Sequence, residues 1–463
     1  MHSIVIVGGG FSGALFALKL RRAKPDWRIV VVEPKRRIGR GIAYGACAPE
    51  HMLNVPVSRM ELGLVPGFAE WLAAQGASGD LQNAFMPRAR FGDYMQEQLA
   101  AARAIRGTAG LHVVRGEAVR LLPAPRRGVL LTDGREIAAD MVVLAMGNLP
   151  PRPPGGPDRW LYDTGYFVPD PWAQDAFDDV DADAPLLLIG TGLTMVDIAL
   201  NLCRQGHRGR MLAVSRRGLL PKAHQGGGGS WPAFLDRALP GSPLALSRVF
   251  RAELRKAAAQ DVPWQRVFDA ARPAIASVWD SWSDAERRQF LRHLRPRWDI
   301  HRHRMAPAVA AELQSLLDSG QLETAAGRIA GYREAGDDVE VALHMRGGGK
   351  RSVVVGHVVN CTGPGGDFDK IAIPLIANLR ENGLAAPDPL GLGLATDDCA
   401  VLGAGGAPSS WLFAIGPLTK PAWWEIVAVP EIALQIERLV TQIANGAAER
   451  LTTQDFLGIG EGI

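Results

Sequence analysis

Hydrophobic positions near the start of the chain form a strand–turn–helix–strand pattern. An apolar, β-branched run at Ser3–Val7 leads directly into a glycine-rich turn, and helical periodicity follows from Ala14 to Arg22. Pro25 ends that pattern, and a second apolar run from Arg28 to Val32 closes on Glu33. Continuous apolar strands around a helix are typical of a buried parallel sheet.

The turn between strand and helix has the spacing Gly-x-Gly-x-x-Gly, at Gly8, Gly10 and Gly13. The first glycine permits the tight turn, the second lets the backbone approach a pyrophosphate, and the third lets helix and strand pack closely. Glu33 is placed to accept hydrogen bonds from an adenosine ribose. With 53 glycines in 463 residues the spacing alone could arise by chance. The flanking elements and the acid favour a dinucleotide site.

Residues around this turn are the first candidates for cofactor binding. Pro34 to Gly41 is a basic loop whose side chains either lie beside the pyrophosphate or are simply solvated. Gly41 to Pro56 is a turn-rich segment expected to cross the cofactor region. The candidates are Gly8, Gly10, Phe11, Ser12, Gly13, Glu33, Pro34, Arg40, Tyr44, Asn54 and Val55.

A second, weaker copy of the pattern begins at Leu186–Ile189. It continues through Gly190-Thr191-Gly192 into a helical pattern from Leu193 to Arg204. Met195 replaces the third glycine, so a βα unit without ligand is the alternative. The next strand ends in Ser215, Arg216 and Arg217, whose donors match the 2′-phosphate of NADP better than a free ribose. We expect Gly190, Gly192, Leu193, Thr194, Ser215, Arg216 and Arg217 to bind NADPH.

The remaining pattern predicts further elements. Strands are expected at 140–146, 353–359 and 412–415, short strands over 111–132 and 322–345, and helices at 68–75, 90–105 and 423–444. The 353–359 strand and its counterpart at 140–146 each run into a glycine, Gly363 and Gly147, and the 412–415 strand runs into Gly416. Residues 243–319 are strongly helical, with a capping box at Ser283–Glu286.

A basic cluster lies at 298–304, expected between helices. His301, Arg302 and His303, together with Arg88, are candidates for binding an anionic substrate, although a solvated face is the alternative. No third ligand accompanies the two histidines, so no metal is expected.

Composition limits the class of protein. A net charge of +3 is too balanced for a nucleic-acid surface, and 47% hydrophobic content is typical of a soluble globular chain. No segment has about 18 uninterrupted apolar residues, so no membrane span is expected. Four scattered cysteines without a Cys-x-x-Cys pair suit a reducing compartment, and we expect a cytoplasmic protein.

Several motifs together resemble a family of FAD/NAD(P)-binding proteins. They include Gly41–Tyr44, His51–Pro56, Pro87-Arg88 with Tyr94, Gly190–Asp197, Arg302–Arg304, Asn360–Gly363 and Trp424-Glu425. The resemblance implies FAD and NADPH as cofactors, O₂ and a small molecule as partners, and contacts from Glu425 and Ile426. Its wider relatives are flavin-dependent monooxygenases, including those that N-hydroxylate amines. The Phe-x-Gly-x-x-x-His fingerprint of Baeyer–Villiger enzymes is missing.

The expected fold is α/β with two Rossmann-like units and a helical insertion. Residues 1–180 and 364–463 are expected to form the FAD unit, 181–240 and 320–363 the NAD(P)H unit, and 241–319 the insertion. The favoured activity is FAD- and NADPH-dependent N-hydroxylation of a small amine or amino-acid-like substrate. The alternatives are a flavin oxidase or reductase without oxygen transfer, with Cys47 as a lone thiol, and a redox-sensing flavoprotein with an interface at Trp411, Trp423 and Trp424. No catalytic acid or base is assigned, and the oligomeric state is undetermined.

Overall fold

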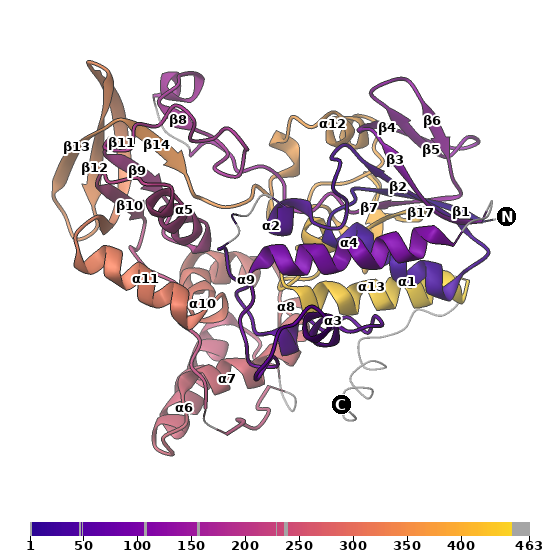
Figure 1. Ribbon diagram of the computed structural model, residues 1–463, viewed down its shortest axis with the longest axis horizontal. Coiled ribbons are helices and arrows are strands. Elements are labelled where there is room, and N and C mark those ends of the chain that lie inside the picture. The colour runs from indigo at the N-terminus through magenta and orange to yellow at the C-terminus, as the bar shows by residue number, and fades with distance from the viewer. Residues whose placement is uncertain are drawn as a thin grey trace.

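The computed structural model describes residues 2–45, 48, 50–105, 109–154, 158–227, 229–235 and 239–446. The main parts of the structure are two seven-stranded sheets and a group of helices (Figure 1). The sheets lie on opposite sides of the molecule, and helices α6–α10 lie below and between them in this view. This arrangement confirms the predicted α/β class with two Rossmann-like units.

The first sheet has the order β15-β16-β17-β7-β1-β2-β3. Its parallel part is made of β1 (Ser3–Val7), β2 (Arg28–Glu33), β3 (Gly110–Arg115), β7 (Met141–Leu144) and β17 (Pro408–Ala414). The short strands β15 (Thr396–Asp397) and β16 (Ala400–Leu402) extend one edge antiparallel. A separate three-stranded sheet contains β4 (Ala118–Leu122), β5 (Gly128–Leu131) and β6 (Glu136–Ala138).

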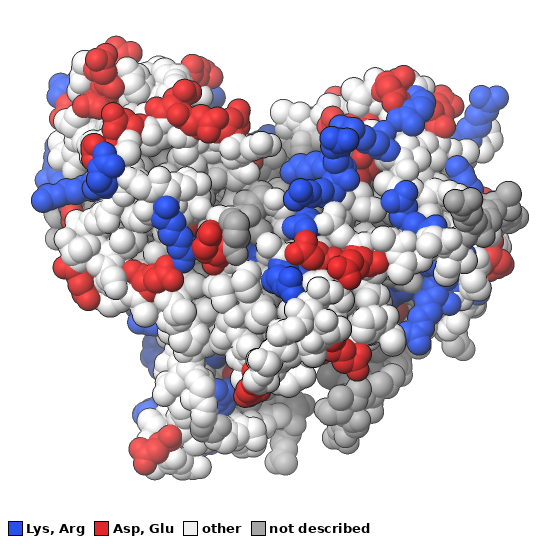
Figure 2. All heavy atoms as spheres, in the orientation of Figure 1, with Lys and Arg blue, Asp and Glu red and all other residues white. Residues whose placement is uncertain are grey.

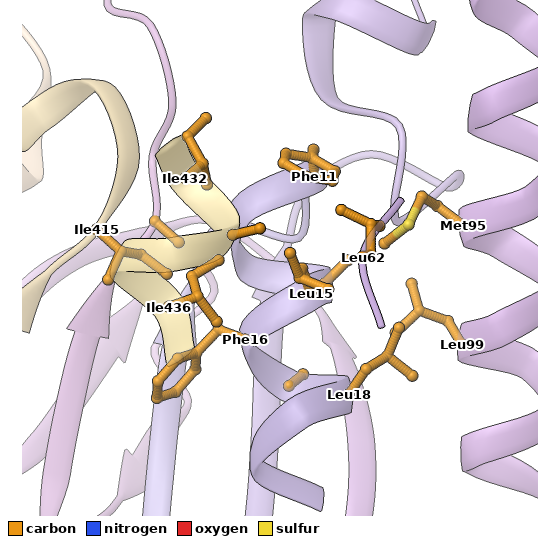
Figure 3. Close-up of a cluster of buried hydrophobic side chains, with 14 of the residues drawn as sticks. Phe11, Leu15, Phe16, Leu18, Leu62, Met95, Leu99, Ile415, Ile432 and Ile436 are labelled. Carbon is orange, nitrogen blue, oxygen red and sulfur yellow. The ribbon is translucent and has the colours of Figure 1, made fainter. Parts of the chain in front are cut away.

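Alternation along the strands divides the apolar side chains between two faces. Ile4 and Ile6 of β1 enter one core, while Val5 and Val7 enter another on the opposite face. The first core is completed by α1 (Phe11–Ala23), α3 (Phe68–Ala74), α4 (Arg88–Ala104) and α13 (Val429–Ala444). Figure 3 shows α1 between α13 and α4, with Leu15 and Phe16 packed among them. Helix α12 (Pro374–Glu381) and the three-stranded sheet cover the other face.

The second sheet has the order β13-β12-β11-β10-β9-β14-β8. The strands are β8 (Phe167–Val168), β9 (Leu186–Ile189), β10 (Met211–Ser215), β11 (Leu322–Ala335), β12 (Asp338–Met345), β13 (Lys350–Val355) and β14 (His357–Asn360). Helices α5 (Leu193–Arg204) and α11 (Pro307–Asp318) pack on one face. The second sheet therefore includes β8, which precedes residue 181, the expected start of the NAD(P)H unit. Helix α11, which lies in the expected insertion, packs on this sheet rather than on the other inserted helices.

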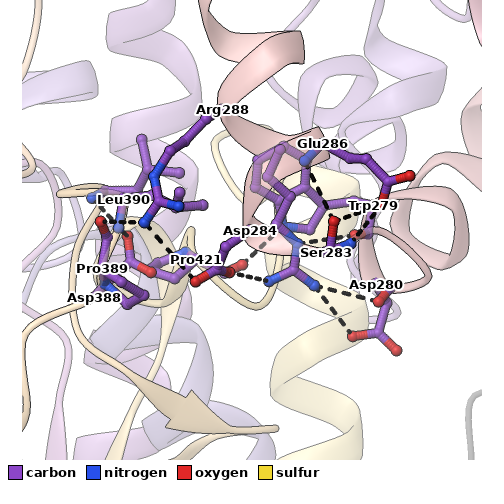
Figure 4. A network of polar contacts seen from close by, with 12 residues as sticks. Trp279, Asp280, Ser283, Asp284, Glu286, Arg288, Asp388, Pro389, Leu390 and Pro421 are labelled. Atoms are coloured by element: carbon purple, nitrogen blue, oxygen red, sulfur yellow. Dashed lines mark hydrogen bonds and ion pairs between the residues drawn. The ribbon is translucent and has the colours of Figure 1, made fainter. Parts of the chain in front are cut away.

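The helices between the sheets are α6 (Pro243–Ala258), α7 (Trp264–Ala271), α8 (Ile275–Asp280), α9 (Asp284–Gln289) and α10 (Arg295–Arg302), and a short α2 (Gly41–Gly45) lies near the first sheet. The predicted capping box opens α9: Ser283 Oγ accepts from Glu286 N, and Glu286 accepts from Ser283 N at 2.8 Å. Figure 4 shows this box beside Arg288 and Trp279. Trp279 Nε1 donates to Pro421 O at 2.8 Å, which ties the inserted helices to the C-terminal segment.

Several predicted elements have different boundaries. The single strand expected at 353–359 is wrong, because Gly356 separates β13, at an antiparallel edge, from β14, which pairs in parallel with β9. The short runs over 322–345 are two long strands. The last helix begins at Val429 rather than at Trp423, with Pro430 in its first turn. Residues 298–302 belong to α10 rather than to a linker.

Candidate functional site

The first glycine turn has the geometry that its spacing predicts. Gly8 has a φ of +104°, and a Cβ there would lie 2.4 Å from Ala145 O, so only glycine fits. A Cβ on Gly13 would lie 2.0 Å from Gly8 O, so this position allows α1 to pack directly on the turn. Gly10 is the N-cap of α1 and gives its first amides no capping side chain. Amides left free in this way suit an anion.

Glu33 lies beside this turn, at the end of β2. Its Oε2 accepts from Gly9 N at 2.7 Å and its Oε1 accepts from Lys35 N at 3.0 Å. The carboxylate therefore fixes the turn and the Pro34 loop to each other, and contact with a ribose remains a prediction. Arg40 forms an ion pair with Asp93 and donates from Nε to Gln96 Oε1 at 2.6 Å. Its charge is thus already paired to α4.

Segments far apart in sequence meet at the N-terminus of α1. Phe11, Tyr44 and Phe91 form an aromatic cluster with ring centroids 4.9–6.0 Å apart. Gly416 lies against Ser12, since a Cβ on it would be 2.7 Å from Ser12 Oγ. Gly147 has a φ of +70° and open space where a Cβ would be. The carboxyl ends of β1, β2, β7 and β17 thus face one region, the usual position of a ligand in such sheets.

The second glycine turn is similar but looser. Gly190 has a φ of +119°, and a Cβ there would lie 2.4 Å from Cys361 O. Gly192 is the N-cap of α5, and a Cβ on it would meet nothing within 4 Å. Met195, in the place of the third glycine, is fully buried in the core of this unit. The open space at Gly192 is compatible with a phosphate group.

Ser215 makes hydrogen bonds within the protein. Its Oγ lies 2.9 Å from Thr191 Oγ1 and accepts from Gly218 N at 3.0 Å. Thr191 donates its own proton to Leu219 O at 2.6 Å, so Ser215 must donate to Thr191. In this structure the Ser215 hydroxyl orders the loop, and its contact with a 2′-phosphate stays a prediction.

Four guanidinium groups gather beyond the end of β10. Burial and the nearby charges of Arg297, Arg346 and Arg216 lower the pKa of Arg217. In the described part of the chain none of the four has an ion pair with an acid. Arg217 Nη2 donates to Arg292 O at 3.1 Å, and Arg216 is exposed. Arg297 comes from α10 and Arg346 from the turn after β12, so no local signal in the sequence pointed to them.

A cavity of about 350 Å³ is lined by residues of α2, by Leu193 and Thr194 at the start of α5, and by Arg302 at the end of α10. Nine predicted site residues line it: Tyr44, Asn54, Val55, Arg88, Leu193, Thr194, Arg302, His303 and Gly363. Residues not predicted also line it, including Asn148, Asp170, Trp172, Asp197, Arg304 and Asn360. The surface is indented between the two lobes, and Lys and Arg side chains border the indentation on the side of the first sheet (Figure 2).

Arg88 is not free to bind an anionic substrate. Its Nη1 and Nη2 lie 2.8 and 3.2 Å from the two carboxylate oxygens of Asp197, and its Nε donates to Met52 O at 2.9 Å. Both side chains are buried, with about a tenth of each exposed. His51 Nε2 lies 3.2 Å from Asp197 O. Arg88 therefore joins α4 to α5, and so the two nucleotide units.

Arg302 is also paired within the protein. Its Nε lies 2.9 Å from Glu425 Oε2 and its Nη2 lies 3.1 Å from Glu431 Oε1. Glu425 also accepts from Trp298 Nε1 at 2.7 Å, and Glu431 from Arg272 Nη2 at 2.6 Å. Glu425 thus belongs to a buried ion-pair network, and its expected contact with a cofactor stays a prediction. Ile426 is fully buried in the first core.

The two histidines have different environments. His301 does not line the cavity: its Nδ1 lies 2.6 Å from Arg297 O and its ring stacks on Phe268 at 5.1 Å. His303 lines the cavity, and burial lowers its pKa to about 4. Burial thus favours the neutral imidazole at neutral pH, and binding of an anionic substrate by residues 301–303 stays a prediction. Arg304 is paired with Asp269.

The described cysteines offer no dithiol. Burial raises the pKa of the Cys203, Cys361 and Cys399 thiols, so they are protonated at neutral pH. Cys47 lies outside the described residues. In the described ranges no helix has the length and apolar content that crossing a bilayer requires.

Comparison with known proteins agrees with this geometry. Residues 5–149 match the model of a family described as FAD-NAD(P)-binding. No curated protein sequence shows significant similarity to the chain.

Solved structures with the same fold include three hydroxylating enzymes. An ornithine N-hydroxylase from Kutzneria sp. 744 superposes with a TM-score of 0.64 at 16% identity, covering 96% of this chain and 99% of that one. An ornithine hydroxylase from Pseudomonas aeruginosa gives 0.63 at 14% identity, with coverage of 96% and 99%. A cadaverine monooxygenase from Erwinia amylovora gives 0.65 at 12% identity, with coverage of 97% and 96%. Residues 5–149 are therefore similar to that FAD-NAD(P)-binding family, and the chain has the same fold as these three enzymes.

Proposed function

We propose that the chain binds FAD at the first glycine turn and NADPH at the second, and that it hydroxylates the nitrogen of a small amine. One observation carries the proposal: two glycine turns each lead into an uncapped helix, and a neighbour of each turn, Tyr44 against Phe11 and Leu193 after Gly192, lines the same cavity. Each turn supplies free backbone amides and the positive end of a helix dipole, which suit a diphosphate.

The residues fit both groups. Open space at Gly192, Gly147 and Gly363 leaves room for a ligand to approach the backbone. The cluster of Arg216, Arg217, Arg297 and Arg346 lies next to the second turn and supports NADPH over NADH, because unpaired guanidinium groups match a phosphate dianion. With the strand order β10-β9-β14, a nucleotide bound at the second turn would have its adenosine end over β10 and its nicotinamide end toward β14 and the cavity.

When bound, FAD supplies the redox chemistry, in which NADPH, a proton, O₂ and an amine yield NADP⁺, water and a hydroxylamine. The chain's own residues hold and enclose the reactants. The Arg88–Asp197 pair fixes the two units to each other, and the Glu425–Arg302–Glu431 network fixes α10 to the segment before α13. The aromatic and aliphatic lining limits access of water to the cavity. His303 is neutral at neutral pH and therefore adds no charge to the cavity.

The alternatives rest on weaker observations. A disulfide reductase needs a reactive dithiol, and the described cysteines are separate, partly or fully buried, and protonated. An interface formed by the C-terminal tryptophans needs exposed rings, and Trp424 is buried against Trp279 at 4.7 Å.

Purified protein, reconstituted with FAD, tests the proposal. We expect a stable flavin absorption spectrum, faster anaerobic reduction by NADPH than by NADH, and amine-dependent hydroxylamine formation in air. Comparing hydroxylamine with hydrogen peroxide separates oxygen transfer from oxidase activity. Protein that retains no flavin would overturn the cofactor assignment, and flavin reduction that never couples oxygen to any amine would overturn the monooxygenase activity.

A further inference from the structure

The charged side chains around the cavity are almost all paired inside the protein. Arg88 is paired with Asp197, Arg302 with Glu425 and Glu431, and Arg304 with Asp269. His303 is neutral at pH 7. Among the described residues that line the cavity, this leaves Asp170 as the charged side chain with no partner of opposite sign.

Asp170 has a fixed position and one free oxygen. It follows β8, the strand next to β14 in the second sheet, and its Oδ1 accepts from Trp172 N at 3.0 Å. Its Oδ2 has neither a hydrogen bond nor an ion pair with the part of the chain that the structure describes. A carboxylate oxygen at the wall of a largely apolar cavity favours a cation beside it.

Trp172 lines the same cavity, two residues further along the chain. Its ring packs edge-to-face with His51, with centroids 5.9 Å apart at 79°. An indole ring and a carboxylate that line the same cavity suit an ammonium group, since both the ring quadrupole and the charge attract a cation. By contrast, the described lining holds no unpaired cation that could receive a carboxylate.

We propose that Asp170 and Trp172 form an ammonium subsite, and that the substrate is an aliphatic amine without a carboxylate group. This inference rests on the proposed function and narrows its substrate class. β8 and β14 lie on the nicotinamide side of the second sheet, so the subsite adjoins the expected reacting centre. Monoamines and diamines share the chemistry that the subsite recognises.

The test measures binding separately from turnover. Pentylamine, cadaverine, lysine and uncharged pentanol are titrated into the oxidised holoenzyme, with the flavin absorption spectrum as the readout. We expect both carboxylate-free amines to bind at least about 10-fold more tightly than lysine or pentanol. The ratio of the two amines then distinguishes a monoamine substrate from a diamine. Equal or tighter binding of lysine, or no binding of either amine, would overturn the subsite.

Substitution then identifies the residues. Asp170→Asn keeps the acceptor for Trp172 N and removes the charge, so it is expected to weaken amine binding about 10- to 100-fold. Trp172→Leu should weaken it less. Asp178→Asn, at an exposed position of the same segment, is the matched control and should change nothing.

Flavin reduction by NADPH separates this subsite from other roles. We expect Asp170→Asn to change the KM for NADPH far less than it changes amine binding. A raised KM for NADPH with unchanged amine binding would assign Asp170 to the nicotinamide carboxamide and overturn the proposal. If the wild type binds amines through Asp170 but never hydroxylates them, the subsite stands and the proposed function fails.

Discussion

At the scale of single residues, chemistry in this protein depends on which charges are already paired. The sequence offered Arg88, Arg302 and His303 as anion binders, but tertiary contacts neutralise each of them. Arg216 and Arg217 remain without an acidic partner in the described chain, and Arg297 and Arg346 join them. A residue's type therefore indicated its chemistry, but only its neighbours decided whether that chemistry is available to a ligand.

Arg216→Ala should raise the KM for NADPH about 10-fold or more and leave the KM for NADH nearly unchanged, because it removes a partner of the 2′-phosphate. Arg346→Ala should do the same if the cluster acts as one site. Steady-state flavin reduction with each nucleotide measures both. The control is Arg208→Ala, an exposed arginine already paired with Asp183. Equal effects on the two nucleotides would remove the argument for NADPH selectivity.

At the scale of elements, α1 and α5 lie close to the positions that the sequence pattern predicted. The pattern did not predict the contacts that connect the two nucleotide units. Helix α1 begins three residues earlier than its periodicity indicated, because Phe11 packs into the aromatic cluster of Tyr44 and Phe91. The start of α4 contacts α5 through the bidentate Arg88–Asp197 pair. The ends of these helices thus hold the two sheets in a fixed relation around the cavity.

Asp197→Asn should destabilise the protein by about 3–5 kcal/mol, because it leaves the buried Arg88 without a counter-charge. Thermal unfolding of the holoenzyme measures the effect. Asp183→Asn, in an exposed pair with Arg208, is the control and should change the stability little. A similar small loss for both would mean that the Arg88–Asp197 pair does not hold the units together.

At the scale of the whole molecule, contacts between the units are polar and partly titratable. His224, in the loop before the inserted helices, has its Nε2 2.8 Å from Asn54 O, and its ring lies 5.2 Å from that of Phe85. Burial lowers the pKa of His224 to about 4. A histidine whose pKa is lowered by folding stabilises the protein above its ordinary pKa near 6.5, and this contribution is lost as the pH falls toward 4.

The unfolding temperature should therefore fall as the pH is lowered from about 6.5 toward about 4, and His224→Gln should make that fall shallower. Glutamine can still donate to Asn54 O but takes up no proton. Thermal unfolding as a function of pH, read above pH 5 before most carboxylates titrate, checks this. His344→Gln, at an exposed position, controls for the loss of a histidine. An unchanged slope would contradict the assignment to His224.

The sequence by itself determined the strand–glycine–helix units, the capping box and the α/β class, because these depend on local periodicity, turn sterics and hydrogen bonds between near neighbours. Only the tertiary structure decided that 353–359 divides between an edge strand, β13, and an inner strand, β14, and that Arg302 and Glu425 neutralise each other. It also decided that Asp170, Arg297 and Arg346 join the candidate sites. Burial and charge pairing depend on residues distant in the chain, and no short segment records them.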